Sequence, residues 1–403
     1  MSTTGDLRRI FKASVKNPLA RDHVEFYDPG YLVVRGDKID LLARDDPRPA
    51  YPSHEFIDLG SKTIVPGFID THVHLPQFAI MGTGVGELLE WLNNYTYPEE
   101  ARFADPEYAG RISRQFFDAL VANGTTTAVI YSSVHEEATD IAFSVAQAKG
   151  IRAFIGKVMM DRNSPPTLLE DTEHSIDASL RLFRKWDGAE SGRLRYIFTP
   201  RYAAACTPEL MKRVGREARE RGAFIQSHLS ENKAEVEWVR SLFPKSPSYA
   251  AVYGEAGLLT ERTIMGHCIH LAADEIELLR RTRTHVAFCP YSNVNLRSGT
   301  MPYARLRDAG IGIALGSDIA GGPSLSMLDQ MRVAISAAAI SWDEALYLAT
   351  LAGAKALGLA DRIGSLEAGK DADFVVISGE TVDEVYLRGQ PSPPGRGRER
   401  SDG

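Results

Sequence analysis

The fold of this chain is decided by one stretch, Ile64-Val65-Pro66-Gly67-Phe68-Ile69-Asp70-Thr71-His72-Val73-His74. Its apolar first half is typical of a buried β-strand. Side chains on a strand alternate between its two faces, so His72 and His74 are expected to point the same way and could bind one metal ion. A His-x-His pattern alone is a weak signal. It is strengthened here because His228, His267 and Asp318 also end apolar, strand-like runs.

The middle of the chain alternates between strand-like and helix-like segments. Eight strand-like runs occur, at 63–74, 125–131, 151–158, 194–200, 223–228, 262–267, 285–289 and 311–318. Amphipathic segments such as 208–221 and 274–282 separate them and predict helices. This alternation predicts an α/β fold, a (β/α)8 TIM-type barrel. An open, doubly wound sheet would use the same alternation, and the count of eight favours the barrel.

Both ends of the chain contain short β-like pieces separated by turns. They lie at 9–13, 31–34 and 38–42 near the start, and at 373–377 and 384–387 near the end. We expect the two ends, 1–65 and 362–403, to build one small β-sandwich domain beside a barrel domain of 66–361. The stretch 390–398 is rich in Pro, Gly and Arg and is expected to be a disordered tail.

Composition excludes several classes of function. The 403 residues carry a net charge of −7, which argues against a general nucleic-acid binder. No apolar run approaches the roughly 20 residues of a membrane helix, and the first residues do not resemble a signal peptide. The three cysteines, Cys206, Cys268 and Cys289, form no Cys-x-x-Cys pair and fit a reducing compartment. We therefore expect a cytoplasmic protein that binds neither nucleic acid nor membranes.

The polar residues at the strand ends predict the position of the site. In a barrel the C-terminal ends of the strands converge on one mouth, where active sites lie. The predicted metal ligands are His72, His74, His228 and Asp318. His267 could be a ligand instead, and we place it behind the ligands, hydrogen-bonded to a bound water. Three imidazoles and one carboxylate suit catalytic zinc, and also iron or another divalent ion. Such an ion would lower the pKa of bound water from about 15.7 to near 7.

Several motifs resemble those of a known family. The segment 66–74 is similar to the first-strand motif of the amidohydrolase superfamily. Blocks that resemble the guanine deaminase family within it lie at 89–98, 123–127, 156–161, 199–202, 226–232, 289–293 and 316–322. Among them, the Glu-Trp-Leu block at 90–92, Thr-Pro-Arg at 199–201 and His-Leu-Ser-Glu at 228–231 are the most specific.

The resemblance implies a homodimeric, mononuclear zinc enzyme that hydrolyses guanine to xanthine and ammonia. Carried over by position, the four ligands named above would hold the metal. Gln77, Arg201 and Glu231 would touch the purine, and Tyr202 stands where an aromatic residue, often Phe, is expected.

We expect three residues to share the chemistry. Glu231 would deliver a proton to ring N3, Asp318 would take the proton of the water, and His267 would stabilise the developing charge. Two alternatives stay open from the sequence. One is deamination of another amino-heterocycle, such as an 8-oxoguanine or a pterin. The other is a metal-free barrel that serves as a binding or assembly protein.

Overall fold

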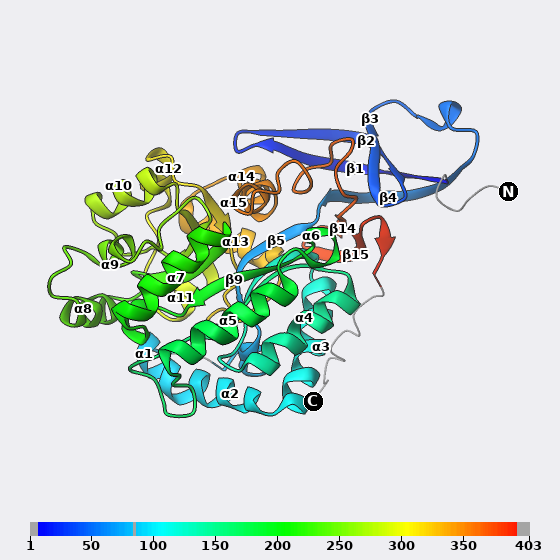
Figure 1. Ribbon diagram of the computed structural model, residues 1–403. Coiled ribbons are helices and arrows are strands. Elements are labelled where there is room, and N and C mark those ends of the chain that lie inside the picture. The colour runs from blue at the N-terminus through cyan, green and yellow to red at the C-terminus, as the bar shows by residue number, and fades with distance from the viewer. Residues whose placement is uncertain (1–6, 84–85, 393–403) are drawn as a thin grey trace, which may run out of the picture.

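The structure, a computed structural model, contains two β-sheets that lie next to each other (Figure 1). It describes residues 7–83 and 86–392. The barrel sheet comes from the middle of the chain and is covered by helices. The terminal sheet, blue and red in Figure 1, comes from the two ends of the chain.

The barrel has eight strands in sequence order. They are β5 (Phe68–His74), β6 (Thr125–Tyr131), β7 (Arg152–Gly156), β9 (Leu194–Pro200), β10 (Phe224–Leu229), β11 (Thr263–His267), β12 (His285–Phe288) and β13 (Ile313–Leu315). All neighbouring pairs are parallel, and a short strand that follows β7, β8 (Val158–Met159), also pairs with β9 in parallel. The strands lie side by side in the same order in which they occur in the sequence, as in a (β/α)8 barrel. The predicted barrel is therefore confirmed, and a doubly wound sheet, in which the strand order reverses, is excluded.

Side-chain and main-chain hydrogen bonds close the barrel between its first and last strands. The hydroxyl of Thr71 donates to the carbonyl of Leu315 over 2.8 Å. The main-chain N–H of Asp318 donates to the carbonyl of His72 over 2.9 Å. This hydrogen bond fixes Asp318, which lies beyond the end of β13, next to His72 of β5.

Helices follow the strands and form the outer layer (Figure 1). The segment after β5 holds α1 (Leu88–Trp91) and α2 (Tyr97–Ala101). The longer helices are α3 (Pro106–Ala122), α4 (Glu136–Lys149), α5 (Thr172–Trp186), α7 (Pro208–Arg221), α8 (Lys233–Leu242), α10 (Ala273–Thr282), α13 (Met327–Ala338) and α14 (Trp342–Ala349). Shorter helices are α6 (Ala189–Gly192), α9 (Tyr249–Glu255), α11 (Pro290–Asn295), α12 (Tyr303–Asp308) and α15 (Leu351–Ala356). Among the described residues, no helix combines the length and apolar character that crossing a membrane requires.

The predicted first run, 63–74, needs a correction, because the chain changes sheets within it. β4 (His54–Pro66) belongs to the terminal sheet, and β5 begins at Phe68. Gly67 donates its N–H to Asp373 of the terminal part over 2.9 Å, whereas Phe68 donates to Gly124 beside the barrel over 3.1 Å. A Cβ atom at Gly67 would lie 2.2 Å from the hydroxyl of Thr126, so the crossing point has room only for glycine.

The terminal sheet has seven strands in the order β16-β15-β14-β4-β1-β2-β3. Its remaining strands are β1 (Arg8–Ala20), β2 (His23–Arg35), β3 (Lys38–Ala43), β14 (Phe374–Ser378), β15 (Thr381–Leu387) and β16 (Gln390–Pro391). Phe11 of β1 and Tyr386 of β15 are three strands apart, about 14 Å in a flat sheet. Their rings lie 5.1 Å apart, so the sheet folds over on itself around an apolar core, as a sandwich does.

Two further expectations concern the end of the chain and the domain boundaries. The composition of 390–398 predicts a disordered tail, and this is wrong for Gln390 and Pro391, which pair with β15 as the edge strand β16. Proline is tolerated in an edge strand because it lacks an N–H that a second neighbouring strand would need. Residues 393–398 of that stretch lie outside the described residues. The division at 65/66 and 361/362 stays a prediction.

Candidate metal centre and active site

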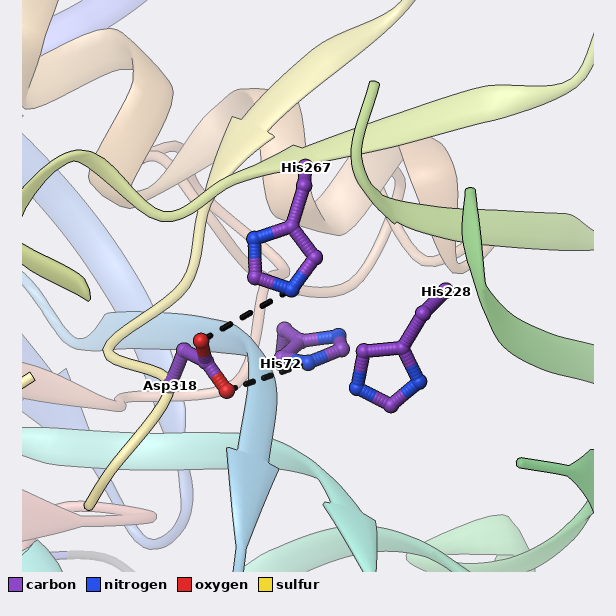
Figure 2. Close-up of side chains that lie close together, drawn as sticks. All are labelled: His72, His228, His267 and Asp318. Atoms are coloured by element: carbon purple, nitrogen blue, oxygen red, sulfur yellow. Dashed lines mark ion pairs between the residues drawn. The ribbon is translucent and has the colours of Figure 1, made fainter. Parts of the chain in front are cut away.

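Four of the five predicted centre residues meet at the C-terminal ends of the barrel strands. His72 lies in β5, His228 in β10 and His267 at the end of β11, while Asp318 follows β13. One ligand atom from each of these four lies within 4.8 Å of all the others (Figure 2). In Figure 2 the carboxylate of Asp318 faces His72 and His267, and the ring of His228 lies beside that of His72.

The fifth predicted residue, His74, borders this cluster. Its Nε2 atom lies 3.2 Å from Nε2 of His228. The same atom lies 3.3 Å from Oδ1 of Asp318. The five residues come from four separate parts of the sequence, and the barrel brings all of them together.

The two oxygens of Asp318 face different partners. Oδ1 lies 3.3 Å from Nε2 of His72 and 3.3 Å from Nε2 of His74. Oδ2 lies 3.7 Å from Nε2 of His267. The carboxylate thus has one side toward the two histidines of β5 and another toward His267.

Hydrogen bonds from neighbouring residues orient two of the rings. Nδ1 of His228 lies 2.7 Å from the carbonyl of Arg201, and Nδ1 of His267 lies 2.9 Å from Oδ1 of Asn293. Both partners are oxygens that accept, so each Nδ1 carries a proton. In the neutral form of either ring, Nε2 is then available as an acceptor or a metal ligand.

His72 is held by two glycines that leave space for its ring. A Cβ atom at Gly266 would lie 2.7 Å from Cε1 of His72. A Cβ atom at Gly316 would lie 2.7 Å from Cβ of His72. Any side chain at either position would displace the imidazole.

The donor set fits a divalent cation. Both ring nitrogens of His72 and Nε2 of His267 are buried and have no hydrogen-bond partner among the described residues. Buried polar atoms without partners are costly, and a bound cation would satisfy those that ligate it. Imidazole nitrogens with one carboxylate suit zinc or another divalent transition metal.

The protonation states also suit a metal site. Burial lowers the pKa of His72 to about 4 and lowers the pKa of His74. Burial holds the pKa of His228 well below its ordinary value. Burial would raise the pKa of Asp318, but the close histidines His72 and His74 hold it well below its usual range. At neutral pH these three histidines are therefore neutral and the carboxylate is ionised, the forms that bind cations.

A cavity of about 410 Å³, including its open mouth, adjoins the centre. All four residues predicted to touch a substrate, Gln77, Arg201, Tyr202 and Glu231, line it. Sequence reasoning did not single out its apolar wall, which consists of Leu88, Trp91, Leu92 and Leu296. Leu88, Trp91 and Leu92 lie in or next to α1. Trp91 and Leu92 belong to the Glu-Trp-Leu block at 90–92, which was the signal that could have located this wall.

Glu231 and His267 lie side by side in the lining of the cavity. Its Oε2 is 3.3 Å from Nε2 of His267, and its Oε1 accepts a hydrogen bond from the hydroxyl of Ser298 over 3.1 Å. Burial raises the pKa of Glu231 to about 7. A carboxyl group in this state can donate a proton near neutral pH.

A buried carboxylate that sequence reasoning missed, Glu100 of α2, connects two of the lining residues. Its Oε1 accepts a hydrogen bond from Nε2 of Gln77 over 3.1 Å. Its Oε2 accepts one from Nη1 of Arg201. Burial would lower the pKa of the Arg201 guanidinium, but Glu100 holds that pKa above its ordinary value. Glu100 lies in a helix away from any strand end, so a search for polar residues at the ends of strands could not find it.

Lys157, which also lies at a strand end, does not join the site. Its ammonium group is buried and bonds to Glu170 over 2.6 Å and to Ser175 of α5 over 3.4 Å. It falls between β7 and β8, where its side chain reaches a surrounding helix and not the cavity.

Comparison with known proteins agrees with this geometry. Residues 63–392 match the model of the amidohydrolase family. A guanine deaminase from Dictyostelium discoideum is 40% identical over 82% of this chain and 79% of its own length. One from Escherichia coli is 39% identical over 91% of this chain and 84% of its own length. The crystal structure of guanine deaminase from C. acetobutylicum with bound guanine has a TM-score of 0.91 and 32% identity, covering 96% of this chain and 100% of that one. The chain therefore belongs to the amidohydrolase family, within the branch of the guanine deaminases.

Proposed function

We propose that this protein is a metal-dependent guanine deaminase, which hydrolyses guanine to xanthine and ammonia with zinc as its cofactor. One observation carries the proposal. Four histidines and an aspartate, all but the half-buried His228 buried, meet beside a cavity lined by Glu231, Arg201 and Gln77. Membership of the guanine deaminase branch supports the same substrate.

We assign the metal to His72, His74, His228 and Asp318. Oδ1 of Asp318 faces both histidines of β5 at 3.3 Å, and Nε2 of His228 lies 3.2 Å from Nε2 of His74. His267 contacts the other oxygen of Asp318 and also Glu231, so we place it behind the ligands. A cation held there would lower the pKa of a bound water to about 7 and supply hydroxide at neutral pH.

The residues around the ring would move two protons. Glu231 donates a proton to ring N3, which makes the neighbouring C2 more electrophilic. The oxygen of water adds to C2 while Asp318 takes the proton that the water loses. Asp318 then gives this proton to the amino group, the C2–N bond breaks and ammonia leaves. The remaining hydroxyl at C2 gives up its proton, which restores the protonated Glu231, while N3 keeps its hydrogen, so the product carries C2=O in place of the amine, as xanthine does.

The remaining lining residues would orient the purine. Gln77 and Arg201 supply hydrogen-bond donors at one side of the cavity, and His267 supports charge as it develops on the attacking oxygen. Leu88, Trp91 and Leu296 supply apolar surface for the faces of a flat ring. Nothing in this arrangement favours an 8-oxoguanine or a pterin over guanine, so guanine is the substrate we propose.

A product assay tests the proposal. Purified protein loaded with zinc is incubated in parallel with guanine, 8-oxoguanine and pterin, and the products are separated by chromatography. We expect xanthine and ammonia in equal amounts from guanine, at a kcat/KM above those for the other two rings. Faster turnover of either competing ring, or binding of guanine without hydrolysis, would contradict the proposal. A homodimer and a cytoplasmic location stay predictions.

A further inference from the structure

Glu100 occupies a position from which it can control how a ring is bound. Its side chain is buried, and its two oxygens each accept a hydrogen bond from a different residue. Those two residues, Gln77 and Arg201, line the cavity, whereas the described lining does not include Glu100. Among the described residues, Glu100 is the one carboxylate within ion-pair distance of Arg201. Any role of Glu100 toward a ligand therefore acts through these two neighbours.

Glu100 also fixes the orientation of the Gln77 amide. A carboxylate only accepts hydrogen bonds, so the group that faces Glu100 at 3.1 Å must be the amide nitrogen of Gln77. The amide oxygen of Gln77 is held from the other side, because the main-chain N–H of Ala320 donates to it over 3.0 Å. Glu100 can only accept a hydrogen bond and the N–H of Ala320 can only donate one. Together they exclude the orientation of the Gln77 amide in which its oxygen and nitrogen are exchanged.

The fixed amide has a consequence for the cavity. The nitrogen of Gln77 carries two hydrogens, and Glu100 takes one of them. The guanidinium of Arg201 carries five hydrogens and has no acceptor atom, and Glu100 takes one of these as well. Both residues can therefore offer the cavity N–H groups, and such a pair matches a ring carbonyl oxygen. An exocyclic amino group in the same place would direct its own N–H groups at the N–H groups of Gln77 and Arg201, and no hydrogen bond could form.

We infer that Glu100 is a positioning residue that makes the site select a purine with an oxygen, and not an amino group, at ring position 6. The inference rests on the proposed function only in taking a purine as the ligand. It extends that function by naming the residue that gives Gln77 and Arg201 their donor character.

The substitution Glu100→Gln tests this role, because it replaces one accepting oxygen by a donating amide. The new amide can accept from Arg201 only by turning its N–H toward Gln77, which removes the constraint on the Gln77 amide. Glu99→Gln is the matched control. Glu99 is the preceding residue of α2, is also buried and also pairs with an arginine, Arg102, at 2.9 Å, but it is not bonded to Gln77 or Arg201.

The readout is the ratio of two affinities, measured by calorimetry on the zinc-loaded protein. Hypoxanthine and adenine differ in carrying an oxygen or an amine at position 6, and both lack the 2-amino group that the proposed reaction removes. We expect wild type and Glu99→Gln to prefer hypoxanthine, and Glu100→Gln to narrow that preference roughly 10- to 100-fold, the range for a hydrogen bond to a charged group. The ratio of kcat/KM for guanine to that for 2,6-diaminopurine should narrow in the same direction.

Thermal melting and zinc content show whether each variant is folded. If Glu100→Gln does not fold, Glu100→Asp replaces it, because a side chain shorter by one methylene cannot reach both partners. An unchanged hypoxanthine-to-adenine ratio in a folded variant overturns the inference, as does a wild type without the preference. The two proposals can fail separately. If guanine is not hydrolysed, but wild type prefers hypoxanthine and Glu100→Gln narrows that preference, then the proposed function is wrong and the inferred role of Glu100 is supported.

Discussion

Glu231 and His267 lie in contact at the edge of the cavity, with Oε2 of Glu231 3.3 Å from Nε2 of His267. Both side chains are buried. Burial raises the pKa of Glu231 to about 7. Burial would lower the pKa of His267, but the neighbouring carboxylates of Glu231 and Asp318 raise that pKa above its ordinary value. The pair thus keeps a proton next to the cavity near neutral pH, which is what a general acid requires.

The substitution Glu231→Gln removes that proton and keeps the size of the side chain. Turnover of guanine should fall about 10²- to 10⁴-fold, the range of a general acid–base step, while zinc content stays at the wild-type level. Steady-state kinetics and elemental analysis measure the two. Glu237→Gln, at an exposed residue of α8, is the control and should behave like wild type. Near-normal turnover in Glu231→Gln would remove this residue from the acid role.

The pH dependence of kcat/KM follows from the same group. Glu231 donates only when protonated, and the protonated fraction declines as pH rises past a pKa of about 7. The rate should therefore fall above about pH 7, approaching tenfold per pH unit. A pH series on wild type and Glu231→Gln checks this, and the decline should be absent from the residual rate of the variant. A variant that keeps the same alkaline decline would assign it to another group.

The substitution His74→Ala tests the ligand assignment. The imidazole of His74 contacts both His228 and Asp318, so its removal should lower zinc content and turnover together. Metal analysis after dialysis, with activity measured on the same samples, gives the result. His174→Ala, which removes an exposed histidine of α5, should leave both values unchanged. A fully metallated and active His74→Ala protein would show that His267, and not His74, completes the ligand set.

A buried ion pair joins the barrel to the terminal part of the chain. Arg152 of β7 donates to Asp371 over 2.7 Å, and both side chains are 2% exposed. The substitution Arg152→Met removes the fully buried partner of Asp371, which keeps Lys38 and Arg362, so it should lower the free energy of unfolding by about 1.5–3 kcal/mol, the range for a hydrogen bond to a charged group. Lys38 pairs with the same aspartate but is 44% exposed, so Lys38→Met should cost less than about 1 kcal/mol. Denaturant unfolding of both variants measures the difference, and equal losses would contradict the account.

The fold could be predicted because its signal is local. Each barrel strand is an apolar run, and each predicted run overlaps an observed strand. The error at 63–74 arose because two consecutive strands of different sheets meet at Gly67 without an intervening loop. Composition carries no sign of that change, since both strands are apolar at the junction. What marks the junction is the packing of Gly67 against Thr126, which only the structure contains.

The site could be predicted only where its residues end strands or lie in a recognisable motif. His72, His228 and Asp318 satisfy the first condition, and Gln77 and Arg201 satisfy the second. Glu100 satisfies neither, because its role depends on α2 packing against Gln77 and Arg201, two residues that are distant from it in the sequence. The preceding residue, Glu99, is also a glutamate of α2 but has different partners, so only three-dimensional contacts distinguish the two.

The most direct test of the central claim is a zinc titration of the metal-free protein, with guanine hydrolysis followed as a function of ions bound per chain. We predict no xanthine from the metal-free protein and a linear rise in turnover that ends at one ion per chain. Full turnover without bound metal, or no turnover at one bound ion per chain, would contradict it.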